Sequence, residues 1–136
     1  MSIAVLKTVA DSLKSIGINY EFGEWKSEIK YPYFVGEYQE TPPLNEDGLQ
    51  ETAFILTGYT RKSWLELEKE KEKIERLFNS NTGKIINCKK VSESDTFLQT
   101  DRTIAIYYNN ALNIPTEDAE LKKIQINLCI KEWRVN

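Results

Sequence analysis

A strict alternation of apolar and polar residues near the C-terminal end of the chain is the feature that most constrains its fold. Four apolar residues alternate with four polar ones over positions 124–131: Ile124, Ile126, Leu128 and Ile130 against Gln125, Asn127, Cys129 and Lys131. Because successive side chains of a strand point to opposite faces, this period of two predicts a strand with one buried and one solvent-facing side. Such strands are typical of antiparallel sheets. The alternation slips at Trp133, which predicts a bulge or the end of the strand there.

Four other segments are rich in aromatic and β-branched residues and are predicted to be strands: residues 31–38, 52–60, 84–91 and 102–108. The first two are joined by residues Thr41–Glu51, which contain two prolines, a glycine and acidic turn residues. We therefore expect a β-hairpin whose loop is longer than usual. A second polar connection, residues 109–120, contains Pro115 and is expected to join the last two strands.

Two segments have the three-and-four spacing of apolar residues that is typical of amphipathic helices. The first covers residues 3–16 and ends before Gly17, where a left-handed residue is expected to terminate it. The second covers residues 63–78 and opens with the capping-box pair Ser63 and Glu66. Its apolar stripe is formed by Trp64, Leu67, Ile74 and Phe78, with Leu77 beside it. Its other face has four pairs of opposite charges: Glu66–Lys69, Glu68–Lys71, Glu70–Lys73 and Glu72–Arg76.

These elements predict an α+β fold in which two helices pack against a mostly antiparallel sheet, in the order α-β-β-α-β-β-β. A length of 136 residues suits one domain that covers the whole chain. The N-terminal segment carries charges within its apolar pattern, so we do not expect a secretion signal. No apolar run approaches the roughly 20 residues of a membrane span, so we expect a cytoplasmically made protein that enters no membrane.

The composition argues against several classes of catalytic and binding site. The chain has no histidine, which removes histidine-based acid–base catalysis, serine–histidine and cysteine–histidine nucleophiles, and histidine-ligated metals. A formal charge of −3 does not favour a general nucleic-acid binder, and no glycine-rich phosphate loop is present. Cys88 and Cys129 have no zinc-ligand spacing and are expected to be two buried thiols rather than a disulfide. We expect no catalytic residue, no cofactor and no metal.

Three further groups of side chains are expected to have structural roles. The acidic residues Glu46, Asp47 and Glu51 match no calcium-binding spacing and suit a solvated turn. The tyrosines of the predicted strands have no basic residues interleaved with them, which favours sheet packing over the stacking of nucleic-acid bases. Basic pairs near strand ends keep sheet edges soluble: Arg61-Lys62, Lys89-Lys90 and Lys122-Lys123.

One part of the chain resembles a known class of protein in its amino-acid sequence. Residues 31–38 (YPYFVGEY), 45–48 (NEDG), 54–61 (FILTGYTR) and 63–68 (SWLELE) together resemble a minor structural protein of long-tailed phages and prophages of Gram-positive bacteria. The size and the element order are similar to those of the tail-terminator and tail-completion proteins of these phages, which are small α+β subunits that assemble into a ring. The resemblance implies a non-enzymatic virion component, made in the cytoplasm of the bacterial host, that terminates the tail or joins it to the head.

The resemblance also implies the partners of the chain. These are copies of itself in a ring, hexameric in the family, together with the tail tube protein and neck or head-completion proteins, and neither a membrane nor a specific nucleic-acid sequence. A ring needs contacts between different patches of identical subunits. We expect the outward face of the sheet and its loops to supply them, rather than the charged helix 63–78. In the long loop, the expected interface residues are Pro42, Pro43, Leu44, Glu46 and Asp47.

Two other classes of function fit the same residues. The first is a small acidic adaptor or regulator that binds a protein partner through helix 63–78 and stays monomeric by itself. The second is a histidine-free enzyme that uses Asp and Glu alone, for example on a sugar, where two carboxylates suffice. The enzyme needs a deep pocket, for which a chain of this size and pattern has little room.

Overall fold

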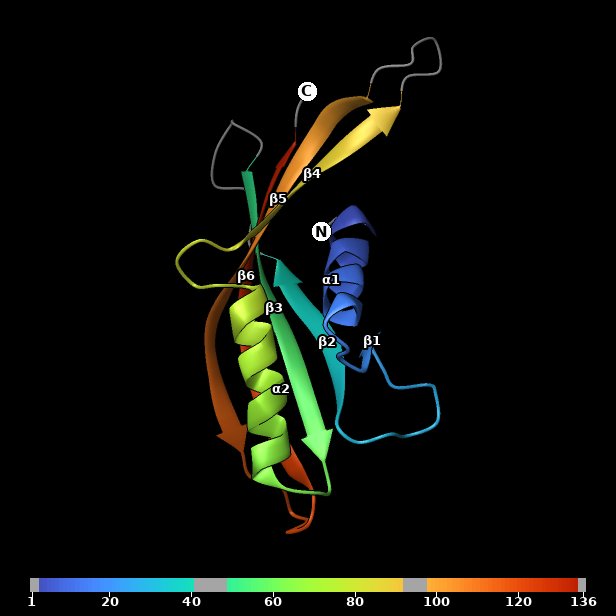
Figure 1. Cartoon of the computed structure of the whole chain (residues 1–136), viewed down its shortest axis with the longest axis vertical. Coiled ribbons are helices and arrows are strands. Elements are labelled where there is room, and N and C mark those ends of the chain that lie inside the picture. The colour runs from blue at the N-terminus through green and yellow to red at the C-terminus, as the bar shows by residue number, and fades with distance from the viewer. Residues whose placement is uncertain (1–2, 41–48, 92–97, 135–136) are drawn as a thin grey trace.

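In the computed structural model, two helices pack on a six-stranded sheet (Figure 1). The structure describes residues 3–40, 49–91 and 98–134, with the backbone alone at 88–91, 98–101 and 134. The predicted α+β class is confirmed, as are both predicted helices and all five predicted strands. The elements are α1 (Ile3–Ser15), β1 (Tyr20–Phe22), β2 (Tyr33–Glu40), β3 (Leu49–Thr60), α2 (Trp64–Leu77), β4 (Lys84–Val91), β5 (Leu98–Ile114) and β6 (Lys122–Arg134).

The C-terminal strand lies in the middle of the sheet. The strand order is β1-β2-β3-β6-β5-β4, and every neighbouring pair is antiparallel except β1 with β2. The predicted hairpin is present, because β2 and β3 pair from Tyr33 opposite Tyr59 to Glu40 opposite Thr52. β6 then inserts between β3 and β5, so the strand with the strictest alternation has a partner on both sides.

Two strands are longer than the sequence pattern indicates, and one was not predicted. β1 has three residues, too few for a periodic signal, and it changes the element order to α-β-β-β-α-β-β-β. β5 continues to Ile114, so residues 109–114 of the predicted polar connection are strand. Their pairing with β6 supplies the backbone partners that override the turn preference of asparagine. β3 starts at Leu49, so the predicted loop Thr41–Glu51 ends before that residue.

The irregularity predicted near Trp133 is the end of the strand and not a bulge. Trp133 pairs in register with Thr103 and Leu49, and β6 ends one residue later. A bulge does occur opposite the middle of β6, where the register of β5 shifts between Tyr108 and Asn110. The long strand β5 follows the curl of the sheet across this point (Figure 1).

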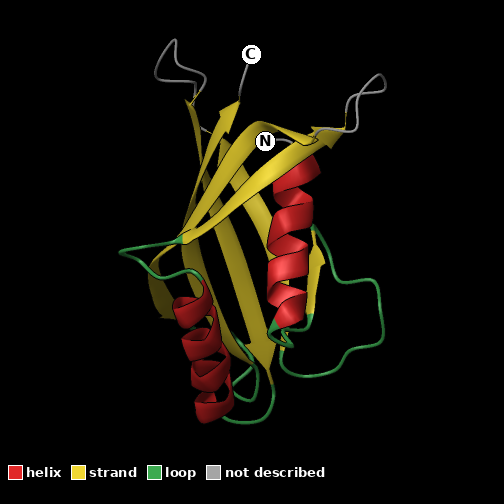
Figure 2. Ribbon diagram, turned by 45° about the horizontal axis from the view of Figure 1, so that its top comes forward, coloured by secondary structure: helices red, strands yellow, loops and turns green. Residues whose placement is uncertain are grey.

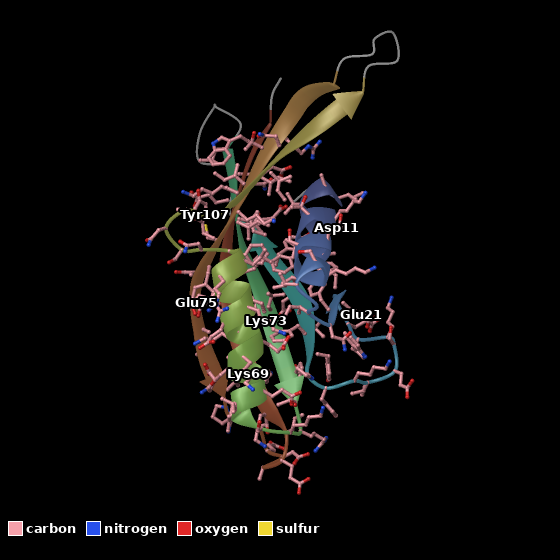
Figure 3. All side chains as sticks on the ribbon, viewed as in Figure 1. Asp11, Glu21, Lys69, Lys73, Glu75 and Tyr107 are labelled. Carbon is pink, nitrogen blue, oxygen red and sulfur yellow. The ribbon has the colours of Figure 1, made fainter. Side chains whose placement is uncertain are left out.

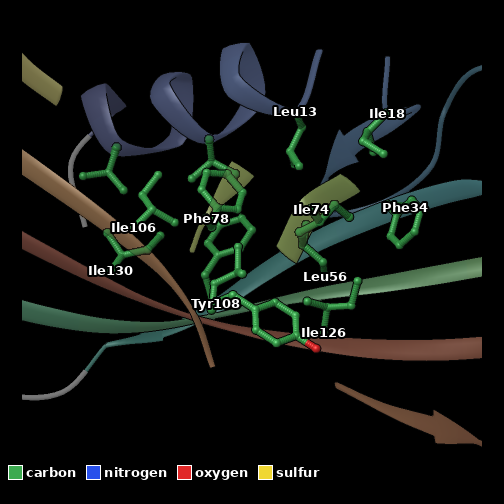
Figure 4. Packing of buried hydrophobic residues seen from close by; sticks show 14 of the residues in the cluster. Leu13, Ile18, Phe34, Leu56, Ile74, Phe78, Ile106, Tyr108, Ile126 and Ile130 are labelled. Carbon is green, nitrogen blue, oxygen red and sulfur yellow. The ribbon is translucent and has the colours of Figure 1, made fainter. Parts of the chain in front are cut away.

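Both helices cover the same face of the sheet (Figure 2). α1 buries Val5, Val9 and Leu13, and α2 buries Leu67 and Ile74. These side chains belong to one apolar layer between helices and sheet. Figure 4 shows Leu13 and Ile74 over strand residues such as Leu56. The buried strand residues include Phe34, Phe54, Leu56, Ile104, Ile106, Ile124, Ile126, Leu128 and Ile130.

The predicted end of the first helix is confirmed. Gly17 has φ 78°, and its backbone N–H donates to the carbonyl of Lys14 at 3.0 Å. The N–H of Ile18 donates to the carbonyl of Leu13, also at 3.0 Å. These two bonds form a Schellman motif, which satisfies carbonyls that the helix end leaves without a partner, and Ile18 is buried in the core.

The second helix departs from its prediction at its first turn. Ser63 caps it as predicted, because the N–H of Glu66 donates to Ser63 Oγ at 3.3 Å. The Glu66 carboxylate accepts from the Thr60 hydroxyl at 3.2 Å and lies 3.6 Å from Lys62, in place of the predicted pair with Lys69. The other three predicted charge pairs are present: Glu68–Lys71 at 3.3 Å, Glu70–Lys73 at 3.0 Å and Glu72–Arg76 at 3.4 Å.

The prediction that Trp64 belongs to the buried stripe of this helix is wrong. Its side chain is 41% exposed, whereas Leu67, Ile74 and Phe78 are fully buried. At 100° per residue, Trp64 lies about 60° from Leu67 around the helix axis, which places it at the border of the stripe.

Gly58 leaves the space that the ring of Phe34 occupies on the neighbouring strand. A Cβ built on Gly58 would lie 2.8 Å from Cδ1 and Cζ of that ring, and Phe34 is fully buried. We therefore expect Gly58→Ala to lower the free energy of unfolding by about 1–3 kcal/mol, measured by urea denaturation. Adding Phe34→Leu should recover part of the loss, since a smaller side chain makes room. An unchanged midpoint in Gly58→Ala would contradict this packing.

Candidate functional site

The candidate site is the sheet face opposite the helices, which we call the open face. Residues paired across neighbouring strands lie on the same face, so the register defines it row by row. It includes the following outward residues of the four inner strands: Tyr33, Val35 and Glu37 of β2; Glu51, Ala53, Ile55, Thr57 and Tyr59 of β3; Lys123, Gln125, Asn127, Cys129 and Lys131 of β6; Asn110 and Leu112 of β5. No helix in the described residues packs on it, as Figure 2 illustrates.

Polar side chains cross-link the middle of the open face. Asn127 Nδ2 donates to Asn110 Oδ1 at 2.7 Å, and Gln125 Nε2 donates to Asn127 Oδ1 at 3.0 Å. Lys131 lies 4.0 Å from the carboxylate of Glu51 on the next strand. Leu112 stands beside this network with 47% of its surface exposed. The open face is therefore a polar, ordered surface with isolated apolar residues, as the alternation of β6 predicts.

Four aromatic side chains form a row at one end of the open face, which we call the aromatic row: Trp25, Tyr31, Tyr33 and Tyr59. The ring centroids of Tyr33 and Tyr59 are 5.1 Å apart, and those of Trp25 and Tyr33 are 4.8 Å apart. Tyr31 is 5.7 Å from Tyr33. Lys123 Nζ lies 5.6 Å from the centroid of Tyr59, within the range of a cation–π contact.

A single carboxylate holds the segment that presents Trp25. Glu21, on β1, accepts hydrogen bonds from the Lys26 N–H at 2.7 Å, the Ser27 N–H at 3.4 Å and the Ser27 hydroxyl at 2.7 Å. Figure 3 shows Glu21 at the base of the segment that follows β1. These bonds hold the pKa of the Glu21 carboxyl below its usual range, because they favour its charged form. The bond from the Ser27 hydroxyl has the largest effect.

The aromatic row borders a shallow groove of about 340 Å³ near the β1–β2 edge of the sheet. Its walls combine rings and carboxylates: Trp25, Tyr33 and Tyr59 with Glu24 and Glu37. A second hollow of about 300 Å³ lies over the middle of the open face, between Ile55, Asn110 and Cys129. Across the residues that the structure describes, no group of three Cys, Asp or Glu side chains lies close enough to hold a metal ion.

The loop residues predicted to form the interface, Pro42, Pro43, Leu44, Glu46 and Asp47, lie outside the described residues, so their role stays a prediction. The strand ends next to this loop, Glu40 and Leu49, are described, and they lie at the same end of the sheet as the ends of β4 and β6 (Figure 1). Glu51 is part of β3, where it faces Lys131.

The aromatic row could not be found from sequence because its basic neighbours come from other strands. Arg61 Nε donates to the Tyr31 hydroxyl at 3.2 Å, and Arg61 also pairs with Asp118 at 2.7 Å. The hydrogen bond from Arg61 lowers the pKa of the Asp118 carboxyl. Lys123 reaches Tyr59 from β6. Two of the three basic pairs thus meet at the end of the sheet that carries the aromatic row, and the backbone places Lys89-Lys90 toward the other end.

The thiol of Cys129 is free and half-buried on the open face, where burial raises its pKa. The expectation of a reduced cysteine is confirmed for this residue, although it is less buried than expected. The side chain of Cys88 lies outside the described residues.

Comparison with known proteins identifies no family for this chain. No protein-family model matches the chain, and no curated protein matches it. Among solved structures it is similar to the Dit protein of phage SPP1, titled a paradigm of the hub adsorption apparatus in phages that infect Gram-positive bacteria. That similarity has a TM-score of 0.31 and 14% identity over 71% of this chain, which spans 39% of that protein. A similarity at this level establishes neither a common fold nor a function. None of the helices in the described residues has the length and apolar character to cross a bilayer.

The bonds to Glu21 predict a pH-dependent change at Trp25. The pKa of Glu21 is lower in the folded protein than its ordinary value of 4.5. Its hydrogen bonds therefore stabilise the segment fully at pH values above 4.5, and they are lost as the pH falls through the pKa of the folded state. In a Trp64→Phe/Trp133→Phe background, Trp25 fluorescence should be steady at neutral pH and change in acid. Glu21→Gln should remove that transition, whereas Glu28→Gln, a change in the same segment, should keep it. If the fluorescence transition persists in Glu21→Gln, another titrating group causes it.

Proposed function

We propose that this chain is a structural, non-enzymatic subunit of a long-tailed phage or prophage particle, a tail-terminator or tail-completion protein that assembles as a ring. The observation that carries the proposal is the open face, an ordered sheet surface that no described helix covers. The phage assignment rests on the resemblance of residues 31–68. The parts of this stretch that the structure describes are contiguous in space, since they form β2, β3 and the first turn of α2.

The open face suits protein contact better than the charged helix does. Side chains at its centre are held by hydrogen bonds along β6 and between β6 and β5, so little rotational freedom is lost when a partner covers them. Apolar residues stand among these polar groups, Leu112 with almost half of its surface in solvent. On α2, the exposed charges pair with one another along the helix, and such pairs contribute only tenths of a kcal/mol to any interaction.

A ring requires each subunit to present two different patches. The sheet offers them at its opposite edges: the aromatic row beside β1 and β2, and the outer edge of β4. A phage subunit with this arrangement needs neither a catalytic centre nor a cofactor, and its mild negative charge does not attract passing DNA.

Self-association should depend on Leu112 and not on the exposed surface of α2. We expect the protein to form oligomers as its concentration rises, measured by size-exclusion chromatography with light scattering. Leu112→Asp should raise the concentration for half-assembly by about tenfold or more, because a charge then has to be buried at the contact. Leu65→Asp is the matched control, since Leu65 is 63% exposed on α2, and Glu68→Lys/Glu72→Lys reverses the helix charge. If the helix variants abolish assembly and Leu112→Asp does not, the interface lies on the helix.

The loop between β2 and β3 should be needed for assembly and not for folding. Replacement of residues 42–47 by a short glycine-containing turn leaves Glu40 and Leu49, the flanking ends of the paired strands, in place. We expect the urea midpoint of the shortened protein to match that of the parent, while light scattering reports monomers where the parent is oligomeric. If the shortened protein still forms the parent's oligomer, the loop makes no contact that assembly needs.

A further inference from the structure

The edge of the sheet on the β4 side changes strand along its length. β4 begins at Lys84, opposite Ile106, so the part of β5 beyond this pairing has β6 on one side only. Among the described residues, only those of β6 are hydrogen-bonded to the backbone from Asn110 to Ile114. Alternate residues of this stretch therefore direct N–H and C=O groups to solvent, and such an edge can bind a further segment of polypeptide. We call residues 110–114 the free β5 edge.

An ordered segment without helix or strand lies at the opposite edge of the sheet, beyond β1 (Figures 1 and 2). The Glu21 carboxylate holds its start, and Asn19 Nδ2 donates to the carbonyl of Lys30 at 3.0 Å. Its side chains from position 26 to position 30 are exposed, Ile29 with 54% of its surface in solvent. We call residues 26–30 the β1–β2 segment. An exposed apolar side chain on a segment that is held in place loses little freedom on contact.

The β1–β2 segment and the free β5 edge lie at the same height along the strands. The register, followed from β1 through β2, β3 and β6 to β5, places Glu21 level with Leu112. Asn19, two residues before Glu21, is then level with Ile114. Because the segment is bonded to Glu21 and to Asn19, it spans the heights of the free β5 edge. A rotation about an axis along the strands keeps these heights, so it brings the segment of one copy beside this edge of the next.

The two patches are also compatible in their side chains. The sequence of the free β5 edge, NALNI, has no charge, so it repels neither the lysines of the segment nor Glu28. Leu112 exposes 47% of its surface on the open face, and Ile29 exposes 54% of its surface at the same height. Contact between these two side chains would remove apolar surface from water on both copies.

We infer that the β1–β2 segment of one copy of this chain binds along the free β5 edge of the next copy, with Ile29 packed against Leu112. The inference deepens the proposed function and rests on it, because it names the two patches of the ring contact. The occupant is a second copy, since the two patches lie at one height on opposite edges of the same sheet. Repetition of one rotation then joins each copy to the next head to tail, as a ring requires.

An aspartate on the β1–β2 segment tests the contact from its second side. Ile29→Asp should raise the concentration for half-assembly by about tenfold or more, measured by light scattering, because a charge then has to be buried. Ile3→Asp is the matched control, since Ile3 is 83% exposed on α1, and it should leave assembly unchanged. Urea denaturation verifies that both variants fold.

Cross-linking shows which patches meet. In a Cys88→Ser/Cys129→Ser background, Ile29→Cys and Leu112→Cys are placed on separate chains, which are mixed as monomers, concentrated and treated with a short bis-maleimide. We expect a cross-linked dimer in the mixture and none from either variant alone, because the contact joins two different patches. Leu65→Cys on α2, mixed with Ile29→Cys, is the control and should give no cross-linked dimer.

The outcomes separate this inference from the proposed function. Weaker assembly of Ile29→Asp, together with the cross-link between positions 29 and 112 of separate chains, supports the contact. Assembly of Ile29→Asp at the parent's concentration, or oligomers without that cross-link, overturns the inference and leaves the ring subunit in place. A cross-link of Leu112→Cys with itself also overturns it, because two copies of the same edge then meet. A parent protein that stays monomeric at every concentration would contradict the proposed function itself.

Discussion

The rest of the structure depends on the one-sided burial of β6. Its even-numbered residues from Ile124 to Ile130 are buried against the helices, and its odd-numbered neighbours stand on the open face. Since β6 is hydrogen-bonded to β3 and to β5, a slip of one residue would turn the buried row to solvent on the central strand and break the register on both sides. Burial of a large apolar side chain contributes about 1.5–3 kcal/mol, so four such residues fix the register strongly.

That constraint also produces the surface to which we assign the function. The side chains excluded from the core by the alternation form hydrogen bonds on the open face instead of packing under a helix: Gln125 donates to Asn127 on the same strand, and Asn127 donates to Asn110 on β5. The bulge after Tyr108 inserts one extra residue into β5 and reverses its alternation, so that Asn110 faces Asn127 on the open face. At the lower end of the sheet in Figure 1, the bonds to Glu21 add Trp25 to this surface, and the aromatic row results.

Local patterns in the sequence were sufficient for the fold class but not for the candidate site. The cap at Ser63, the left-handed Gly17 that ends α1 and the alternation of β6 each depend on residues a few positions apart, and each was predicted. The short strand β1 and the second half of β5 are held by pairing with distant segments, so local propensity does not reveal them. The aromatic row joins positions 25, 33 and 59 with Lys123, and only the strand order places them together.

The central claim is that copies of this chain meet through the open face, with the helices away from the contact. Electron cryomicroscopy of the assembled protein tests it most directly, because a reconstruction shows both the symmetry and the elements at the contact. The account predicts a closed ring of head-to-tail subunits whose contacts are made by the open face, with α2 facing solvent. A two-fold dimer, or a ring whose contacts are made by α2, would contradict it.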